Sequence, residues 1–189
     1  GNVINEGLST REVFDSALTD LLDVTGSEYG FIGEVRYKDD KPFLNTYALT
    51  NIAWNDETRA FYEENAPQGL EFYNLDTLFG QVMVTREAVI ANDPANDPRA
   101  GGIPQGHPDL NAFLGIPFFR GGQMLGMVGV ANREQGYDKA LIEYLEPLLK
   151  TCANVIHSER SQQMRARAEA ARWRGDGKAA VEWETRASV

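Results

Sequence analysis

The sequence is poor in the side chains that build metal centres and disulfide frameworks. It holds one cysteine, Cys152, and two histidines among 189 residues, so it has no cysteine cluster for zinc or iron–sulfur and cannot form an internal disulfide. A chain without disulfides suits a reducing compartment, and we expect a cytoplasmic location. No cofactor is firmly predicted, and the fold has to be held by a packed apolar core.

Long apolar runs and an excess of basic residues are also missing. No stretch approaches the roughly 18 consecutive apolar residues of a membrane span, and the beginning lacks the charged-then-apolar pattern of a signal peptide. The net charge of -10 disfavours binding to nucleic acid or to anionic lipid, because both attract basic surfaces. We therefore expect no nucleic-acid partner and no membrane contact by this segment.

The sequence contains no recognisable catalytic signature. There is no Ser-His-Asp arrangement, phosphate-binding loop or zinc-protease motif. Pairs of acidic residues are plentiful, but none lies in a glycine-rich or histidine-containing frame that hydrolysis would need. The sequence therefore predicts a protein that is not an enzyme.

The composition is that of a globular domain with an extension. Hydrophobic residues make up 42% of the chain and charged residues 24%. From Glu159 onward the chain carries seven basic and five acidic residues, a net charge of +2, which leaves -12 for residues 1–158. We predict a domain over residues 9–158 and a helical linker or tail over residues 159–189, leading towards an output module.

The hydrophobic pattern predicts an α+β fold with a central antiparallel sheet and helices on its faces. Two tight hairpins are expected, one turning at Asp39-Asp40 and one between Arg120 and Gln123. The predicted elements are a helix from Ser9 to Gly26, strands at 29–37 and 43–49, helices capped by Asn55 and Asn74, strands at 88–91, 113–119 and 124–131, and a long helix from Asp138.

Two further features concern a loop and the last helix. Residues 92–110 lack periodicity and hold half of the eight prolines, which favours an ordered lid, because loops of that length are usually functional. In the last helix, apolar residues alternate in steps of four and three, a pattern of about two heptads that indicates a helix-pairing seam. The seam consists of Leu141, Leu145, Leu148, Cys152 and Val155.

Several short phrases follow one another in a characteristic order. They are Phe31–Val35, Thr50–Asn55, Ala91–Pro94, Gly101–Pro104, His107-Pro108, Phe113–Pro117, and Gly126–Arg133 with Gly136–Asp138. In this order they resemble the GAF domain found in bacterial sensor histidine kinases and diguanylate cyclases. The resemblance covers about residues 9–158. It implies terminal helices packed together on one face of the sheet, where a dimer forms, and a ligand pocket under the long loop on the other face.

Within that frame, four aromatic residues are candidates for lining the pocket, because flat side chains bury a ligand ring at little entropic cost. Each of them also suits an ordinary core position. They are Trp54, Phe72, Phe79 and Phe113.

Polar candidates come from the predicted lid. The guanidinium of Arg99 suits a carboxylate or phosphate on a ligand, with Asn96 and Asp97 beside it. The same residues are also typical turn formers, whose side chains bond to the local backbone. His107 joins the ligand-binding candidates, and it is either an ordinary hydrogen-bonding residue or, as in some GAF sensors, a haem ligand.

The resemblance leaves other ligands and activities to weigh. Bilin-binding GAF domains carry a cysteine near the pocket histidine, and the free methionine sulfoxide reductases of this fold need redox cysteines in the pocket. Cys152, on the last helix, fits neither and is expected to be a small core residue. Asn132-Arg133 and Tyr137-Asp138 faintly resemble the motif of cyclic-nucleotide-binding GAF domains, although they also suit a strand end and a helix cap.

The resemblance implies a function in signal transduction, of the two-component kind. A small molecule binds under the lid, and a homodimer paired through its terminal helices relays the signal to a kinase or cyclase output domain. The alternative is a module that has lost its ligand and serves as a dimerisation spacer. Cyclic-nucleotide binding is a lesser alternative.

Overall fold

A single antiparallel sheet organises the molecule. The computed structural model describes residues 9–50, 69–101 and 109–188, together with positions 56, 60 and 64. Its six strands lie in the order β3-β2-β1-β6-β5-β4, and every neighbouring pair is antiparallel. The strands are β1 (Tyr29–Lys38), β2 (Lys41–Leu49), β3 (Glu71–Phe72), β4 (Val89–Ala91), β5 (Phe113–Arg120) and β6 (Gln123–Ala131).

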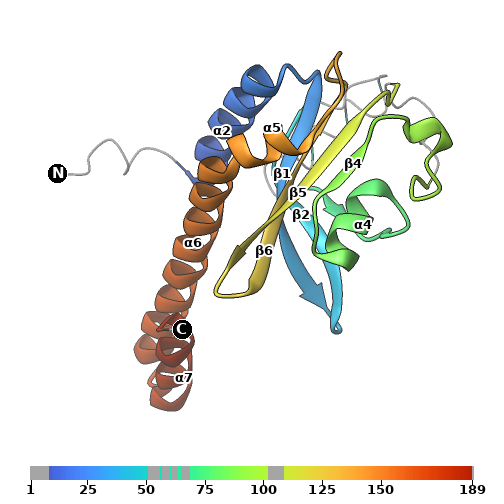
Figure 1. Cartoon of the computed structure of the whole chain (residues 1–189). Coiled ribbons are helices and arrows are strands. Elements are labelled where there is room, and N and C mark those ends of the chain that lie inside the picture. The colour runs from blue at the N-terminus through green and yellow to red at the C-terminus, as the bar shows by residue number, and fades with distance from the viewer. Residues whose placement is uncertain are drawn as a thin grey trace.

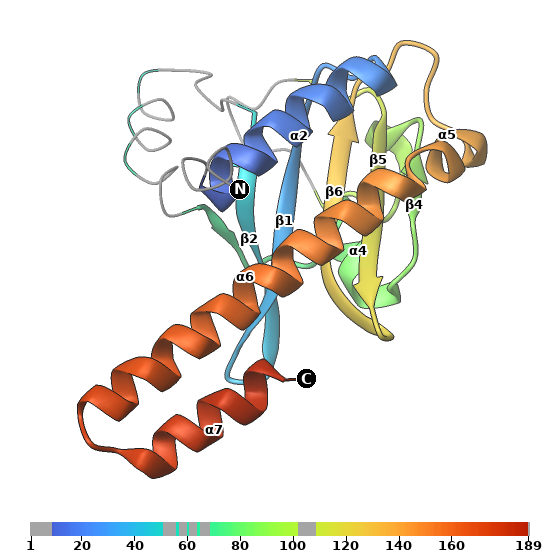
Figure 2. The same cartoon turned by 90° about the vertical axis from the view of Figure 1, so that its left-hand side faces the viewer.

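Helices cover both faces of this sheet. Figures 1 and 2 show α2 and the first half of α6 lying across one face, whereas α4 lies on the opposite face. The predicted α+β class is confirmed. The helices are α2 (Thr10–Thr25), α4 (Leu78–Thr85), α5 (Lys139–Tyr144), α6 (Glu146–Trp173) and α7 (Gly177–Ala187), with a short 3₁₀ turn, η1 (Pro94–Asn96).

Both predicted hairpins form, and their turns explain why. Asp39 and Asp40 have φ of 51° and 63°, and Gly121 and Gly122 have φ of 57° and 79°. Two consecutive left-handed residues give the turn type whose twist matches that of paired strands. Aspartate and glycine are among the residues that adopt this conformation most readily.

Helix α2 begins and ends where the sequence predicts, but α4 begins later. The Ser9 hydroxyl accepts a hydrogen bond from the backbone N–H of Glu12 at 3.1 Å, and Gly26 ends the helix with φ of 65°. For α4 the prediction of Asn74 as cap was wrong. The Asn74 side chain accepts instead from the N–H of Asp76, forming a local turn, and Thr77 caps the helix.

The long last helix is interrupted near its start. Asp138 caps α5, whose last turn ends at Leu145, and α6 then begins with Pro147 in its first turn. Proline lacks the N–H that a continuous helix would use, so it is tolerated only at such a start. All five residues of the predicted seam pack against the core between the helices and the sheet within this chain.

The end of the chain, for which the sequence predicts a helical linker or tail, forms a helical hairpin with α6. Helix α7 folds back along α6 after a turn at Gly175, where φ is 75° (Figure 2). The Trp183 ring lies between the guanidinium groups of Arg167 and Arg186, at 4.8 and 4.7 Å from the ring centroid. Glu184 forms an ion pair with Arg172.

The apolar interior is divided by the sheet into two clusters. The helix-side cluster contains Phe14, Leu21, Ile32, Val128 and Ile156, among others, and lies between the sheet and helices α2 and α6. The second cluster lies between the sheet and α4. None of the described helices is long and apolar enough to cross a membrane.

Candidate functional site

The face of the sheet that carries α4 is unusual at its centre. Strand pairing places Phe31, Gly129, Gly115 and Val89 in one row across β1, β6, β5 and β4. Two neighbouring glycines leave the middle of the row without side chains. This row, with the side chains that pack over it, is the candidate ligand-binding face of the molecule.

Phenylalanine rings lie over both glycines. A Cβ atom on Gly129 would come within 2.4 Å of the Phe31 ring, and one on Gly115 would come within 2.9 Å of the Phe113 ring. Rings packed over strand glycines shield the exposed backbone. The glycines therefore provide the space that these two rings occupy.

Two more aromatic rings complete this surface. Phe79 on α4 meets Phe31 edge to face, with centroids 6.4 Å apart, and meets Phe72 on β3 at 6.0 Å. Such edge-to-face pairs are favourable for aromatic rings. The structure thus brings the predicted residues Phe72, Phe79 and Phe113 into one apolar cluster, while Trp54 lies outside the described residues.

The described part of the predicted lid is held by hydrogen bonds of its own. The Arg99 guanidinium donates to both carboxylate oxygens of Asp97, at 2.9 and 2.7 Å, and to the carbonyl of Ile90 at 2.9 Å. The hydrogen bonds from Arg99 lower the pKa of Asp97 to about 2. Asn96 donates to Asp93 at 2.9 Å. The guanidinium that was predicted to meet a ligand therefore already has a carboxylate partner.

The lid is anchored to the start of α4. A Cβ on Gly101 would come within 1.8 Å of the Asp76 carbonyl oxygen, so only glycine permits this close approach. His107, further along the same loop, lies outside the described residues.

The residues that resemble a cyclic-nucleotide motif have structural partners. Asn132, at the end of β6 with φ of 64°, accepts from the N–H of Asn111 and donates to the carbonyl of Asp109. The hydroxyls of Tyr137 and Ser27 share a hydrogen bond of 2.7 Å, and the Asp138 carboxylate caps α5. These contacts end the strand and begin the helix, which is the structural alternative stated above.

A buried ionic cluster, which was not predicted from the sequence, lies on the opposite face of the sheet. Glu34 on β1 has 2% of its surface exposed, and its carboxylate bonds to both Arg36 and Arg160 at 2.6 Å. Such burial is rare for a glutamate unless it is paired. The available signal was the alternation of Ile32, Glu34 and Arg36, which puts a charge on the same face as a core residue.

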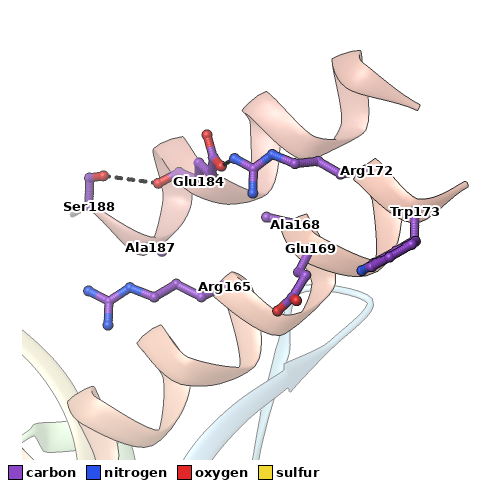
Figure 3. A pocket seen from close by; sticks show the side chains of 8 residues that line it. All are labelled: Arg165, Ala168, Glu169, Arg172, Trp173, Glu184, Ala187 and Ser188. Carbon is purple, nitrogen blue, oxygen red and sulfur yellow. Dashed lines mark hydrogen bonds and ion pairs between the residues drawn. The ribbon is translucent and has the colours of Figure 1, made fainter. Parts of the chain in front are cut away.

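Two other features have less to offer as ligand sites. A groove of about 890 Å³ lies between α6 and α7, away from the sheet (Figure 3). Its walls include Arg172 and Glu184, which form an ion pair.

The Cys152 thiol is buried in the helix-side core, and burial raises its pKa to about 12, which suppresses the reactive thiolate. Within the described ranges, no three metal-ligating side chains come together.

Solved structures share this architecture. The GAF domain of a phosphoenolpyruvate-protein phosphotransferase from Coxiella burnetii superposes with a TM-score of 0.66 at 17% identity, covering 86% of this chain and 90% of that chain. A type II free methionine-R-sulfoxide reductase from Thermoplasma acidophilum superposes with a TM-score of 0.58 at 13% identity, covering 79% and 92%. Both similarities concern the fold, and they show that a domain of a phosphotransferase and a reductase share it.

Sequence comparison gives a more specific relationship. The chain is 28% identical over 163 residues to the methyl sulfide methyltransferase-associated sensor of Methanosarcina acetivorans. The match covers 83% of this chain but only 15% of that protein, so the chain corresponds to a small part of its relative. The family model of the GAF domain matches residues 7–157. This chain therefore belongs to the GAF domain family.

Proposed function

We propose that this chain is a non-catalytic sensory module that binds a small molecule between the α4 face of the sheet and the long loop. Binding biases the position of α6, and a homodimer relays that change to a kinase or cyclase output domain in the cytoplasm. The observation that carries the proposal is the difference between the two faces of one sheet. One face presents four phenylalanine rings, and the other supports a helix that extends beyond the sheet.

The composition of the α4 face supports a ligand with a flat, apolar part. Phe31, Phe72 and Phe79 are each only partly buried by the described residues, although they adjoin a buried cluster. Partly covered aromatic rings around a glycine floor suit a ligand ring, because they offer area without many rotatable bonds. Arg99, tied to Asp97, contributes to the shape of the loop in this proposal rather than to ligand charge.

The dimer has a different basis from the seam that the sequence suggested, since those residues pack inside the chain. On α2, Val13 and Val24 are 36% and 52% exposed, and they lie about three helical turns apart on one side of the helix. Exposed apolar side chains on one side of a helix suit pairing between two copies. We therefore place the proposed dimer contact on α2 together with the neighbouring side of α6.

A second candidate function, a dimerisation spacer without a ligand, also has an observation in its favour. The rings of Phe31 and Phe113 already fill the space over Gly129 and Gly115. A face that fills its own gap needs no ligand to be stable. The two functions predict different results for the purified protein. A receptor retains a small-molecule ligand, whereas a spacer does not.

Native mass spectrometry of the purified protein tests the proposal. We expect a dimer carrying a reproducible adduct of a few hundred daltons, and we expect Phe79→Ala to lose the adduct while remaining folded. Tyr144→Ala is the matched control, because Tyr144 is 69% exposed on α5. A dimer that shows no adduct, and no thermal shift with any compound of a metabolite library, would support the spacer. A stable monomer at micromolar concentration would refute relay through paired helices.

A further inference from the structure

Strand β1 contributes side chains to both faces of the sheet. Successive residues of a strand point to opposite faces, so Phe31 and Val35 belong to the α4-side cluster while Ile32 and Glu34 face the helices. If contacts on the α4 face displace β1, the neighbouring residues of the strand therefore move on the helix face as well. Next to Val35, the residue that faces the helices is Glu34.

The Glu34 carboxylate is shared between a strand and a helix. One oxygen accepts from Nε of Arg36, on the same strand, and the other accepts from Nε of Arg160 on α6, both at 2.6 Å. Arg160 also donates through Nη2 to the Val35 carbonyl at 3.0 Å. Because Glu34 is almost fully buried, these charge-assisted bonds are needed to offset its desolvation.

Arg160 lies at a mechanically important point on α6. Ile156, one turn earlier, is the last α6 residue buried in the helix-side core. The buried residues further along, Ala168 and Ala171, lie in the half of α6 that pairs with α7. The neighbouring Glu159 accepts a hydrogen bond from Thr10 of α2 at 2.7 Å. Arg160 therefore fastens the helix to the sheet at the point where it leaves the domain.

A spare hydrogen-bond donor lies opposite Glu34. Asn45 on β2 is the direct cross-strand neighbour of Glu34 and is 1% exposed. Directly opposed residues of an antiparallel pair share a face, with Cβ atoms about 5 Å apart. Among the described residues, Nδ2 of Asn45 has no hydrogen-bond partner. An unsatisfied buried amide is costly, and a carboxylate is a strong acceptor for it.

We propose that Glu34 is a two-position latch for α6, bonded to Arg160 in the state seen here and to Asn45 when the helix is released. The exchange keeps the buried carboxylate hydrogen-bonded in both states, which is the condition for a small energy difference between them. A movement of β1 that starts on the α4 face shifts the equilibrium between the Arg160-bonded and the Asn45-bonded states. The inference rests on the proposed function for the source of that movement, but the latch itself is measurable without any ligand.

Hydrogen exchange of the amides of residues 157–164 reports release of the helix. We expect Arg160→Met to raise their exchange rates at least about tenfold, since it removes one partner of a buried charge, while amides of β5 and β6 stay protected. Arg160→Lys keeps the charge but loses the planar guanidinium that reaches Glu34 and the Val35 carbonyl together, and it should give a smaller increase. The control is Arg120→Met, because Arg120 joins β5 to Asn154 of α6 through an exposed hydrogen bond of 2.9 Å.

Asn45→Leu separates a latch from a simple brace. The substitution removes the partner of the released state without touching Arg160, so we expect exchange at residues 157–164 to become slower than in the unaltered protein. A brace without an alternative partner predicts no slowing beyond that of the β5 and β6 amides, because loss of an unsatisfied buried amide stabilises the domain as a whole. Exchange at residues 157–164 that is unchanged, faster, or slowed only as much as that of β5 and β6 would overturn the latch.

A mutant cycle tests transmission through β1. Val35→Ala disturbs the α4 face next to the latch, and Val89→Ala is the matched control, because both valines are 3% exposed on that face. When Arg160 is present, we expect Val35→Ala to change the exchange rates of residues 157–164. When Arg160→Met is already in place, we expect Val35→Ala to have no further effect on these rates. The effect of Val89→Ala should be the same in both backgrounds. Additive effects of Val35→Ala and Arg160→Met would refute coupling. A spacer that never binds a ligand can still pass this test.

Discussion

The two faces of the sheet are built on different principles. On the helix side, large aliphatic and aromatic residues from α2, α6 and four strands pack together, and the same face carries a buried ionic group, Glu34, which is bonded to Arg160 of α6. On the α4 side, the centre of the sheet is glycine, and phenylalanine rings cover it. Two elements as long as α2 and α6 hold the first face, whereas a helix of eight residues, α4, covers the second. The comparison indicates that stability is concentrated on one face and adaptability on the other.

The glycines show the same contrast at the scale of single atoms. On the helix side, a Cβ at Gly126 would come within 2.2 Å of the backbone oxygen of Gly33. On the α4 side, the three atoms nearest to a Cβ at Gly129 would all belong to the ring of Phe31. A backbone oxygen inside a sheet cannot move aside, but a ring can rotate into neighbouring space. One face is therefore rigid where the other can adjust.

Truncating one apolar side chain on each face gives the largest expected difference. Ile156→Ala, at a position with no exposed surface, should lower the free energy of unfolding by about 2–5 kcal/mol. Phe79→Ala, although it removes a larger side chain, should cost less, because Phe79 is only partly buried. Urea denaturation of both variants measures the difference. Equal losses would contradict the division of labour between the faces.

Alanine at the two glycines sharpens the comparison. Gly126→Ala should lower the free energy of unfolding by roughly 1–3 kcal/mol, since the new methyl group meets backbone. Gly129→Ala should cost less, and it should change the ring resonances of Phe31 in NMR spectra as the ring moves away. Chemical denaturation ranks the two variants. A larger loss for Gly129→Ala would show that the α4 face is the rigid one.

Alkaline pH should weaken the helix-side core specifically. Burial raises the pKa of Cys152 from 9.0 to about 12, so its contribution to stability is complete below pH 9 and is lost as the pH rises towards 12. By pH 10 the loss should reach about 1.4 kcal/mol. Cys152→Ala removes this thiol. Between pH 8 and 10, the free energy of unfolding of the variant, measured by urea titration, should therefore fall less than that of the unaltered protein. Identical slopes for the two proteins would indicate that the thiol is accessible in the native state.

The smallest effect is expected in the loop on the α4 side. Arg99 lowers the pKa of Asp97 to about 2, so this contribution is present above pH 4 and is lost as the pH falls through 2. Water and salt screen an exposed pair, and Arg99→Gln should hardly move the unfolding midpoint. The same variant should return the pKa of Asp97 towards 3.8, measured by NMR titration. An unchanged pKa would mean that the two side chains do not pair in solution.

Local sequence signals were reliable where neighbours along the chain decide the structure. The turns at Asp39-Asp40 and Gly121-Gly122 and the cap at Ser9 follow from backbone preferences of those residues and are found as predicted. The cap of α4 was misplaced because Asn74 and Thr77 both suit it, and only packing selects between them. The two-residue strand β3 was not predicted, because it has too few residues to show a period.

The candidate site was predicted in part. Phe79 and Phe113 lie on elements that the sequence pattern predicts, whereas Phe72 lies on β3, which the pattern does not predict, and the structure brings all three rings into one apolar cluster. The pairing of Arg99 with Asp97 was not predicted, since the sequence does not reveal which of several nearby groups a guanidinium contacts. The packing of α7 on α6 was missed for a related reason. Its interface uses alanines, including Ala168, Ala171 and Ala180, which give a weak hydrophobic signal.

The sequence by itself determined the fold class, the hairpins and the lack of an internal disulfide, because these depend on residue periods, turn conformations and the single cysteine. Only the tertiary structure decided how the faces differ. The glycine floor under Phe31 and Phe113, and the bonds from Glu34 to Arg160, join residues up to 126 positions apart in the chain. Such contacts depend on strand register and helix position, and neither is encoded at any single place in the sequence.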